Sequence, residues 1–267
     1  MPRFNNEDVC TYTTLLDRIP HDETTTKEGR TYTVNGERFL LESVTTNLRV
    51  INAPDMNDWR VKHGKEESDR LRDEGGDIGT MAHKAALRLA NGEGYGMYEW
   101  ERLGFPVPVG EDVCKDERVR NCVRGLTLVM KDHKLTPGNA ELFVWSRKYL
   151  FAGTLDKVEI NDGYADIYDW KTSGRLFVPV WLQLAAYAIA FEECYGIPVR
   201  RIYPVRLDRG LPNTRSARYE LGREFKKPDG TVVHEEYKEG TAINDAFYAY
   251  LNALQLGQYI KSQGGRY

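Results

Sequence analysis

The sequence contains few cysteines and no long apolar segment. Four cysteines are scattered among 267 residues, without a CxxC pair or a histidine at zinc-ligand spacing. This excludes a disulfide framework or zinc centre as the organising element and favours reduced, buried thiols. No apolar run approaches the roughly 20 residues of a membrane helix. The first residues also lack the apolar core of a secretory signal. We therefore expect a soluble, cytoplasmic protein.

The chain has little net charge and no low-complexity tract. Its 37 basic and 40 acidic residues give a net charge of −3. That value does not exclude a nucleic-acid partner, because local clusters and bound cations set the field at a site. Without a repeat or linker, we expect one domain over residues 1–267. It would comprise an N-terminal arm (1–35), a mainly helical portion (36–135), and a sheet core with a C-terminal helix (136–267).

Hydrophobic periodicity and turn residues predict the elements. In the first half we expect a loose arm over 1–35, a helix N-cap at Ser43, and an exposed helix over 57–74 broken by Gly75-Gly76. A second helix follows over 81–90, and a loop or lid over 93–112. In the second half the pattern predicts helices at 116–131, 179–195 and 241–261, strands at 140–146, 150–160, 164–170 and 200–207, and a hairpin across 215–238.

The most informative stretch is residues 151–187, where two predicted strands each carry an acidic residue. Asp156 lies on the first strand and Asp169, thirteen residues later, on the second. Lys171 shares a strand face with Asp169, because side chains at i and i+2 point the same way. Charged residues at the end of an apolar strand need a partner. Two carboxylates on one hairpin can converge on a hard divalent cation such as Mg²⁺.

Neighbouring residues add to this candidate centre. Glu141, on the preceding predicted strand, could supply a third oxygen ligand. The lysine could orient a water or neutralise a phosphate. We favour that electrostatic role, because an ordinary lysine pKa of about 10.4 is too high for a base. Gln183 and Tyr187 share one helical face and could either contact substrate or brace Lys171. Metal ions held by carboxylates supply what phosphodiester hydrolysis requires.

Four ordered motifs in the chain resemble those of RecB-like PD-(D/E)XK nucleases. GTLD (153–156) and DWKTS (169–173) resemble motifs II and III, and QLAAY (183–187) resembles the QxxxY motif. Upstream, GTMAH (79–83) resembles the first motif. SVT (43–45) and the helix around Trp59 are similar to the mitochondrial genome maintenance exonuclease branch and its phage relatives. The combination is far more specific than any single motif.

The resemblance implies a restriction-endonuclease-like α/β core, a mixed sheet flanked by helices, with an N-terminal helical portion. It implies metal-dependent cleavage of DNA, usually exonucleolytic, with Mg²⁺ or Mn²⁺ as cofactor. By the same resemblance, the catalytic and metal-site residues are Asp156, Asp169, Lys171, Glu141 and His83. The substrate-side residues would be Gln183, Tyr187, Thr172 and Ser173.

The resemblance also implies a substrate, a partner and a location, and the sequence departs from it in two features. Single-stranded DNA ends are the expected substrate, in recombination, repair or replication, with a possible recombination or replication protein as partner. The location would be the host cytoplasm if a phage encodes the chain. Only Cys194 follows the core, so we expect no iron–sulfur cluster, and no GxxxxGK[ST] loop is present for a helicase. A non-catalytic DNA-binding module and a structure-specific endonuclease remain alternatives.

Overall fold

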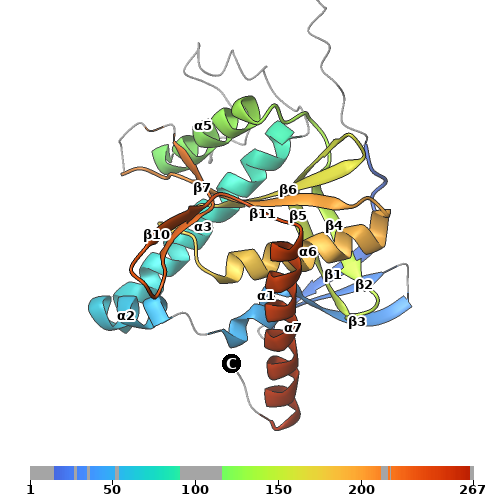
Figure 1. Cartoon of the computed structure of the whole chain (residues 1–267). Coiled ribbons are helices and arrows are strands. Elements are labelled where there is room, and N and C mark those ends of the chain that lie inside the picture. Colours follow the sequence, from blue (N-terminus) through green and yellow to red (C-terminus); the bar gives the residue numbers. More distant parts are fainter. Residues whose placement is uncertain are drawn as a thin grey trace, which may run out of the picture.

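A computed structural model describes residues 15–26, 29–34, 37–51, 54–90, 116–211, 216 and 218–264. Within these residues the protein is a mixed α/β structure, with a large central sheet flanked by helices (Figure 1). The sheet has nine strands in the order β1-β2-β3-β5-β6-β7-β11, with β4 paired to β5 and β8 paired to β7. A separate two-stranded sheet joins β9 and β10.

The strands are β1 (His21–Thr25), β2 (Arg30–Val34), β3 (Glu37–Ser43), β4 (Ala140–Ser146), β5 (Phe151–Asn161), β6 (Tyr164–Lys171), β7 (Val199–Leu207), β8 (Tyr219–Leu221), β9 (Arg223–Lys226), β10 (Val232–Glu235) and β11 (Lys238–Glu239). The helices are α1 (Val44–Asn47), the short 3-10 helix η1 (Leu48–Val50), α2 (Pro54–His63), α3 (Lys65–Ala90), α5 (Glu117–Asp132), α6 (Pro179–Tyr195) and α7 (Thr241–Ser262). None of these helices is long and apolar enough to cross a membrane.

The β5–β6 hairpin forms the centre of the sheet. Its turn consists of Asp162 and Gly163, whose φ angles of 55° and 79° are those of a tight two-residue hairpin turn. β5 pairs with β6 along one edge and with β4 along the other, since Lys157 is in register with a residue on each side. The hairpin is therefore held on both sides of β5, which fixes its register.

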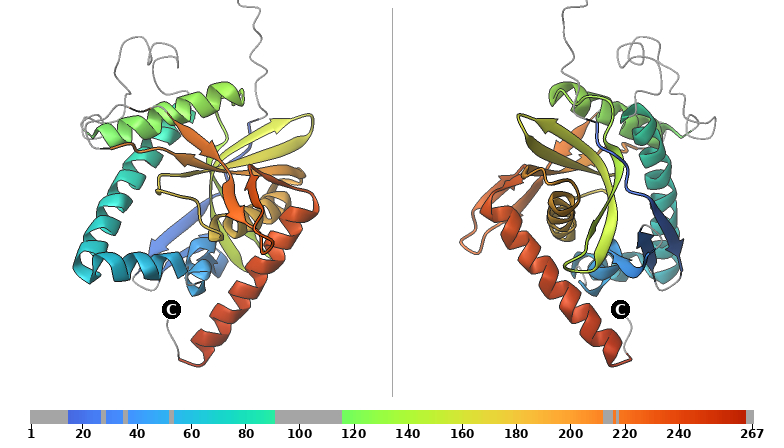
Figure 2. Two further views of the ribbon diagram at one scale, coloured as in Figure 1. Left: turned by 60° about the vertical axis from the view of Figure 1, so that its left-hand side comes forward. Right: turned by 90° about the vertical axis from the view of Figure 1, so that its right-hand side faces the viewer.

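Helix α6 connects β6 to the parallel strand β7 and packs on one face of the sheet. Pro179 opens the helix, and Gly196 closes it in a left-handed conformation with φ of 67°. Most of its residues are buried in an apolar core shared with α1, α7 and the sheet. The right-hand view of Figure 2 shows α6 end-on, with the sheet between it and α3.

Helices α3 and α5 cover the opposite face. Their apolar residues pack on Tyr168, Trp170 and Val205 of β6 and β7 and form a second core. Ser43 caps α1 as predicted, its hydroxyl accepting a hydrogen bond from the Thr46 amide at 3.1 Å. The strands predicted over residues 140–207 and the helices predicted at 116–131, 179–195 and 241–261 are confirmed within one or two residues at their boundaries. The hairpin expected across 215–238 is shorter: β9 and β10 form it over 223–235, while β8 and β11 pair with β7.

Three predictions about the first half of the chain were wrong. The arm contains two strands, β1 and β2, which pair antiparallel at the sheet edge. The helix expected over 57–74 is interrupted at Gly64. It is not broken at Gly75-Gly76, because α3 continues through both glycines to Ala90. Packing of α3 against α5 and the sheet overrides the low helix propensity of the two glycines. The loop or lid expected over 93–112 lies outside the described residues.

Candidate metal centre and adjoining groove

The two hairpin carboxylates are buried, and a backbone amide holds one of them. Asp156 is 8% exposed and Asp169 is 2% exposed. The Trp170 amide of β6 donates a hydrogen bond of 2.7 Å to Oδ2 of Asp156 on β5. This cross-strand bond ties the position of one carboxylate to the strand that carries the other. The hairpin therefore presents both groups in a fixed arrangement.

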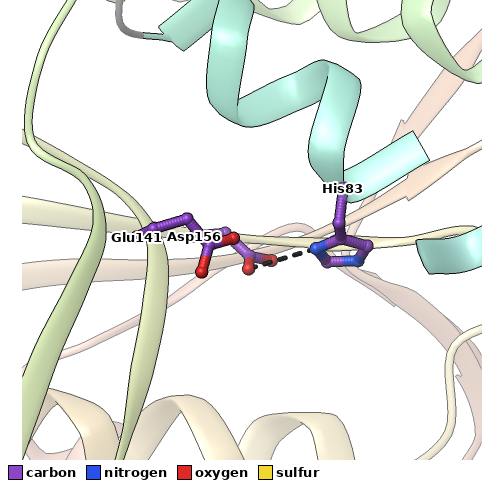
Figure 3. Close-up of side chains that lie close together, drawn as sticks. All are labelled: His83, Glu141 and Asp156. Carbon is purple, nitrogen blue, oxygen red and sulfur yellow. Dashed lines mark ion pairs between the residues drawn. The ribbon is translucent and has the colours of Figure 1, made fainter. Parts of the chain in front are cut away.

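His83 and Glu141 complete a cluster around Asp156. One ligand atom from each of the three residues lies within 4.8 Å of the others, and the three side chains point toward one another (Figure 3). The Nδ1 atom of His83, on α3, is 3.3 Å from Oδ1 of Asp156. The structure thus joins residues separated by more than seventy positions of sequence. It is the one such group of three among the residues described here.

Glu141 reaches the cluster through an unusual backbone conformation. Its φ of 49° is positive although it lies in β4, a conformation that costs energy for a residue with a side chain. The guanidinium of Arg18 donates to the carbonyl oxygens of Glu141 and Ala140 at 3.2 and 3.1 Å, which secures this segment. Burial and the nearby Asp156 carboxylate raise the pKa of Glu141 to about 7.

His83 carries positive charge between these acids. Attraction to Asp156 raises its pKa to about 9, against the opposing effect of burial. Burial is the largest single effect on Asp156 and raises its pKa, but His83, Lys171 and the Trp170 amide together outweigh burial and lower that pKa. The cluster therefore favours a cation at its centre.

Lys171 stays charged beside Asp169. Its Nζ lies 2.6 Å from Oδ2 of Asp169. Burial lowers the pKa of Lys171, but Asp169 and Asp156 outweigh burial and raise it above the ordinary value. Burial raises the pKa of Asp169 even though Lys171 opposes that change. A charged ammonium supports the electrostatic role predicted for this lysine and disfavours a role as base.

Gln183 and Tyr187 brace Asp169 from α6. The amide of Gln183 donates to Oδ1 of Asp169 at 3.2 Å and contacts the Tyr187 hydroxyl at 3.2 Å. Both side chains are buried. Gly153 makes room for Tyr187, because a Cβ atom there would lie 2.4 Å from Cε1 of Tyr187. A direct contact of these two residues with substrate stays a prediction.

A groove of about 700 Å³ opens beside the cluster. His83 and Lys171 line its inner end, and the predicted substrate-side residues Thr172 and Ser173 form part of its wall. Sequence reasoning did not assign a role in this groove to Phe177 or Arg209. Neither residue belongs to one of the four motifs, so the sequence carried no signal for them beyond their residue type.

The donor set fits a hard divalent cation. Of the four predicted ligands, the structure brings His83, Glu141 and Asp156 together. Asp169 is outside that group, because its two carboxylate oxygens contact Lys171 and Gln183. Carboxylate oxygens from Asp156 and Glu141 are suited to Mg²⁺ or Mn²⁺, and an imidazole nitrogen also binds Mn²⁺. Glu141 and His83 would each give up a proton to act as ligands, as metal binding generally requires. The cluster and groove together define a class of site: a buried acidic centre with a lysine, open to solvent along one side. Comparison with models of known protein families and with curated proteins gave no match.

Proposed function

We propose that the protein is a Mg²⁺- or Mn²⁺-dependent DNA exonuclease with a restriction-endonuclease-like core. The observation that carries this proposal is the convergence of Asp156, Asp169 and Lys171 at one end of a buried hairpin, next to an open groove. The mixed sheet with helices on both faces is compatible with that core. Single-stranded ends are the proposed substrate.

Each side chain has a defined task in this proposal. Asp156, Asp169, His83 and Glu141 would hold the metal. The bound metal would supply charge neutralisation at the phosphate and an activated water. Lys171 would place its ammonium beside the scissile phosphate, where a charged donor stabilises the developing negative charge. On the covering helix, Gln183 keeps Asp169 in its orientation by donating to the carboxylate oxygen that faces away from the lysine.

The test compares cleavage of an end-labelled single-stranded oligonucleotide in Mg²⁺ or Mn²⁺ by wild type and two variants. Asp169→Asn removes a ligand charge at constant shape, and Lys171→Met removes the ammonium. We expect each to reduce the rate by at least about 100-fold, the scale of a lost transition-state contact. His234→Gln, at an exposed position of β10, is the matched control and should cleave normally.

Two outcomes would contradict the proposal. Equal cleavage of circular and linear single strands would rule out an exonuclease and favour an endonuclease. Absence of metal-dependent cleavage, with DNA binding that persists in Asp169→Asn, would favour a non-catalytic DNA-binding module.

A further inference from the structure

One face of α3 forms a continuous wall of the groove. Arg72, Gly76, Gly79 and His83 follow each other at helical spacing of three or four residues, and all four line the groove. Eleven residues separate the first from the last, so the wall is about 16 Å long at ~1.5 Å per residue. The wall leads to the metal centre, because His83 is both its last residue and a member of the cluster.

The two glycines of this wall, Gly76 and Gly79, have different structural explanations. Gly79 allows close packing, since a Cβ there would lie 3.2 Å from the Thr172 hydroxyl oxygen. Gly76 has no such reason: it is exposed, and a Cβ there would meet no atom within 4 Å. Glycine weakens a helix relative to alanine. Packing within the protein therefore does not account for a glycine at this position, whereas a ligand backbone passing close to the helix would.

Arg209 places a positive charge on the same groove. It lines the groove, and its guanidinium forms no ion pair with any residue that the structure describes. The Nη1 atom lies 3.3 Å from where a Cβ on Gly75 would be. Among the residues described, the hydrogen bond to Arg209 is made to its backbone carbonyl, which accepts from Asn121 at 2.8 Å. By contrast, Arg72 is already paired with Asp69 and Asp73.

Two aromatic side chains also face this space. Trp59 of α2 and Phe177, just before α6, both line the groove. The Arg175 guanidinium covers the Phe177 ring at 4.9 Å. Aromatic rings beside a cationic groove are typical of sites for unpaired bases, because a base in a duplex has no free face to stack.

We propose that this groove holds the single-stranded segment of a nucleic-acid substrate leading to the metal centre, with Arg209 contacting a backbone phosphate and Gly76 keeping the wall open. At a stacked spacing of ~3.4 Å, the wall accommodates roughly five nucleotides. This inference rests on the proposed function, and it adds a phosphate-binding residue and a steric determinant outside the four motifs.

The steric part is tested by Gly76→Ala and Gly76→Leu. Both replace a helical glycine, so both should raise the melting temperature, by about 2–4 °C. Binding of a fluorescein-labelled 20-nucleotide oligothymidylate is measured by anisotropy in Ca²⁺, with the oligonucleotide checked for integrity afterwards. We expect Gly76→Ala to bind within threefold of wild type and Gly76→Leu to bind at least tenfold more weakly. Wild-type affinity in Gly76→Leu would overturn the proposal.

The electrostatic part is tested by the salt dependence of the same binding. Arg209→Gln should lower the slope of log affinity against log salt by about 0.7, the value for one phosphate contact on a single strand. Arg201→Gln is the matched control, because Arg201 lies near the other end of β7 and is paired with Glu239. Its slope should equal that of wild type. An unchanged slope in Arg209→Gln would contradict the phosphate contact.

Comparing the cleavage and binding results distinguishes a failure of this inference from a failure of the proposed function. If wild type cleaves in Mn²⁺ but the groove variants bind normally, the groove assignment fails and the nuclease proposal stands. If the variants behave as expected but wild type cleaves nothing, the groove assignment stands and the nuclease proposal fails. Oligouridylate of the same length shows whether the strand is RNA or DNA. Binding of either supports the groove, and binding of neither overturns it.

Discussion

Metal binding at the His83 cluster should release protons in a countable amount. With a pKa of about 9, His83 is fully protonated at pH 7, and with a pKa of about 7, Glu141 is about half protonated. Both must be deprotonated to act as ligands, so binding should release about 1.5 protons. Removing the proton from His83 at pH 7 costs about 2.7 kcal/mol, at ~1.36 kcal/mol per pKa unit.

The pH dependence follows from the same linkage. A metal that displaces protons binds more tightly as pH rises, and release of about 1.5 protons corresponds to a roughly 30-fold gain in affinity between pH 6.5 and 7.5. The gain should level off above the His83 pKa of about 9, where no proton remains to be displaced. Isothermal titration calorimetry with Mn²⁺, in two buffers of equal pH but different ionisation enthalpy, measures the proton number directly.

Two variants show whether the protons released on metal binding come from the His83 cluster or from another part of the protein. His83→Gln should reduce the release to less than one proton, since only Glu141, whose pKa the His83 imidazolium otherwise lowers, would still lose a proton on binding. His234→Gln, which changes an exposed histidine of β10, should release as many protons as wild type. The reasoning is refuted if wild type releases less than half a proton, or if His83→Gln releases as many as wild type.

Three further predictions concern stability without metal. Because the folded-state pKa of Glu141 is raised from 4.5 to about 7, its charge destabilises the fold progressively as pH rises through that window. Glu141→Gln should therefore raise stability at pH 7.5 by about 1–3 kcal/mol but leave it unchanged at pH 4, as measured by urea unfolding. Lys157→Met should cost about 3–5 kcal/mol, because it removes the cation 3.1 Å from the buried Glu159 carboxylate and leaves that charge with the two hydrogen bonds from Thr136; a loss below 1 kcal/mol in the same assay would contradict this. Gly153→Ala should cost about 1–3 kcal/mol by displacing Tyr187, and an unchanged thermal melt would disprove the close packing.

The second half of the fold was predictable because its signals are local. The β5–β6 hairpin is specified by a tight turn and two apolar strands, and α6 by Pro179 and Gly196. The missed elements depend on partners elsewhere. The five residues of β1 are all exposed, so no apolar alternation in the sequence marks this strand. β1 forms because it pairs with β2. α3 runs through Gly75-Gly76 because its apolar residues pack on α5 and the sheet.

The candidate site divides in the same way. The Asp156, Asp169 and Lys171 arrangement follows from strand periodicity and one short turn, which sequence spacing can give. The orientation of Glu141 could not be predicted, because it depends on a positive φ within a strand. Arg209 and Phe177 come to the groove from segments joined only by the tertiary fold. Their approach to His83 is a property of packing that no spacing rule contains.

The hydrogen bond from the Trp170 amide to Asp156 would make the affinity of the proposed metal centre depend on the register of the sheet. Each strand of the hairpin carries one carboxylate, and a slip of β6 by one residue would turn Asp169 and Lys171 to the opposite face. Such a chain would keep its secondary structure, and so its far-ultraviolet circular dichroism, while losing the cluster. Metal titration would therefore count correctly paired molecules in a preparation, including refolded ones, where spectroscopy of secondary structure would not.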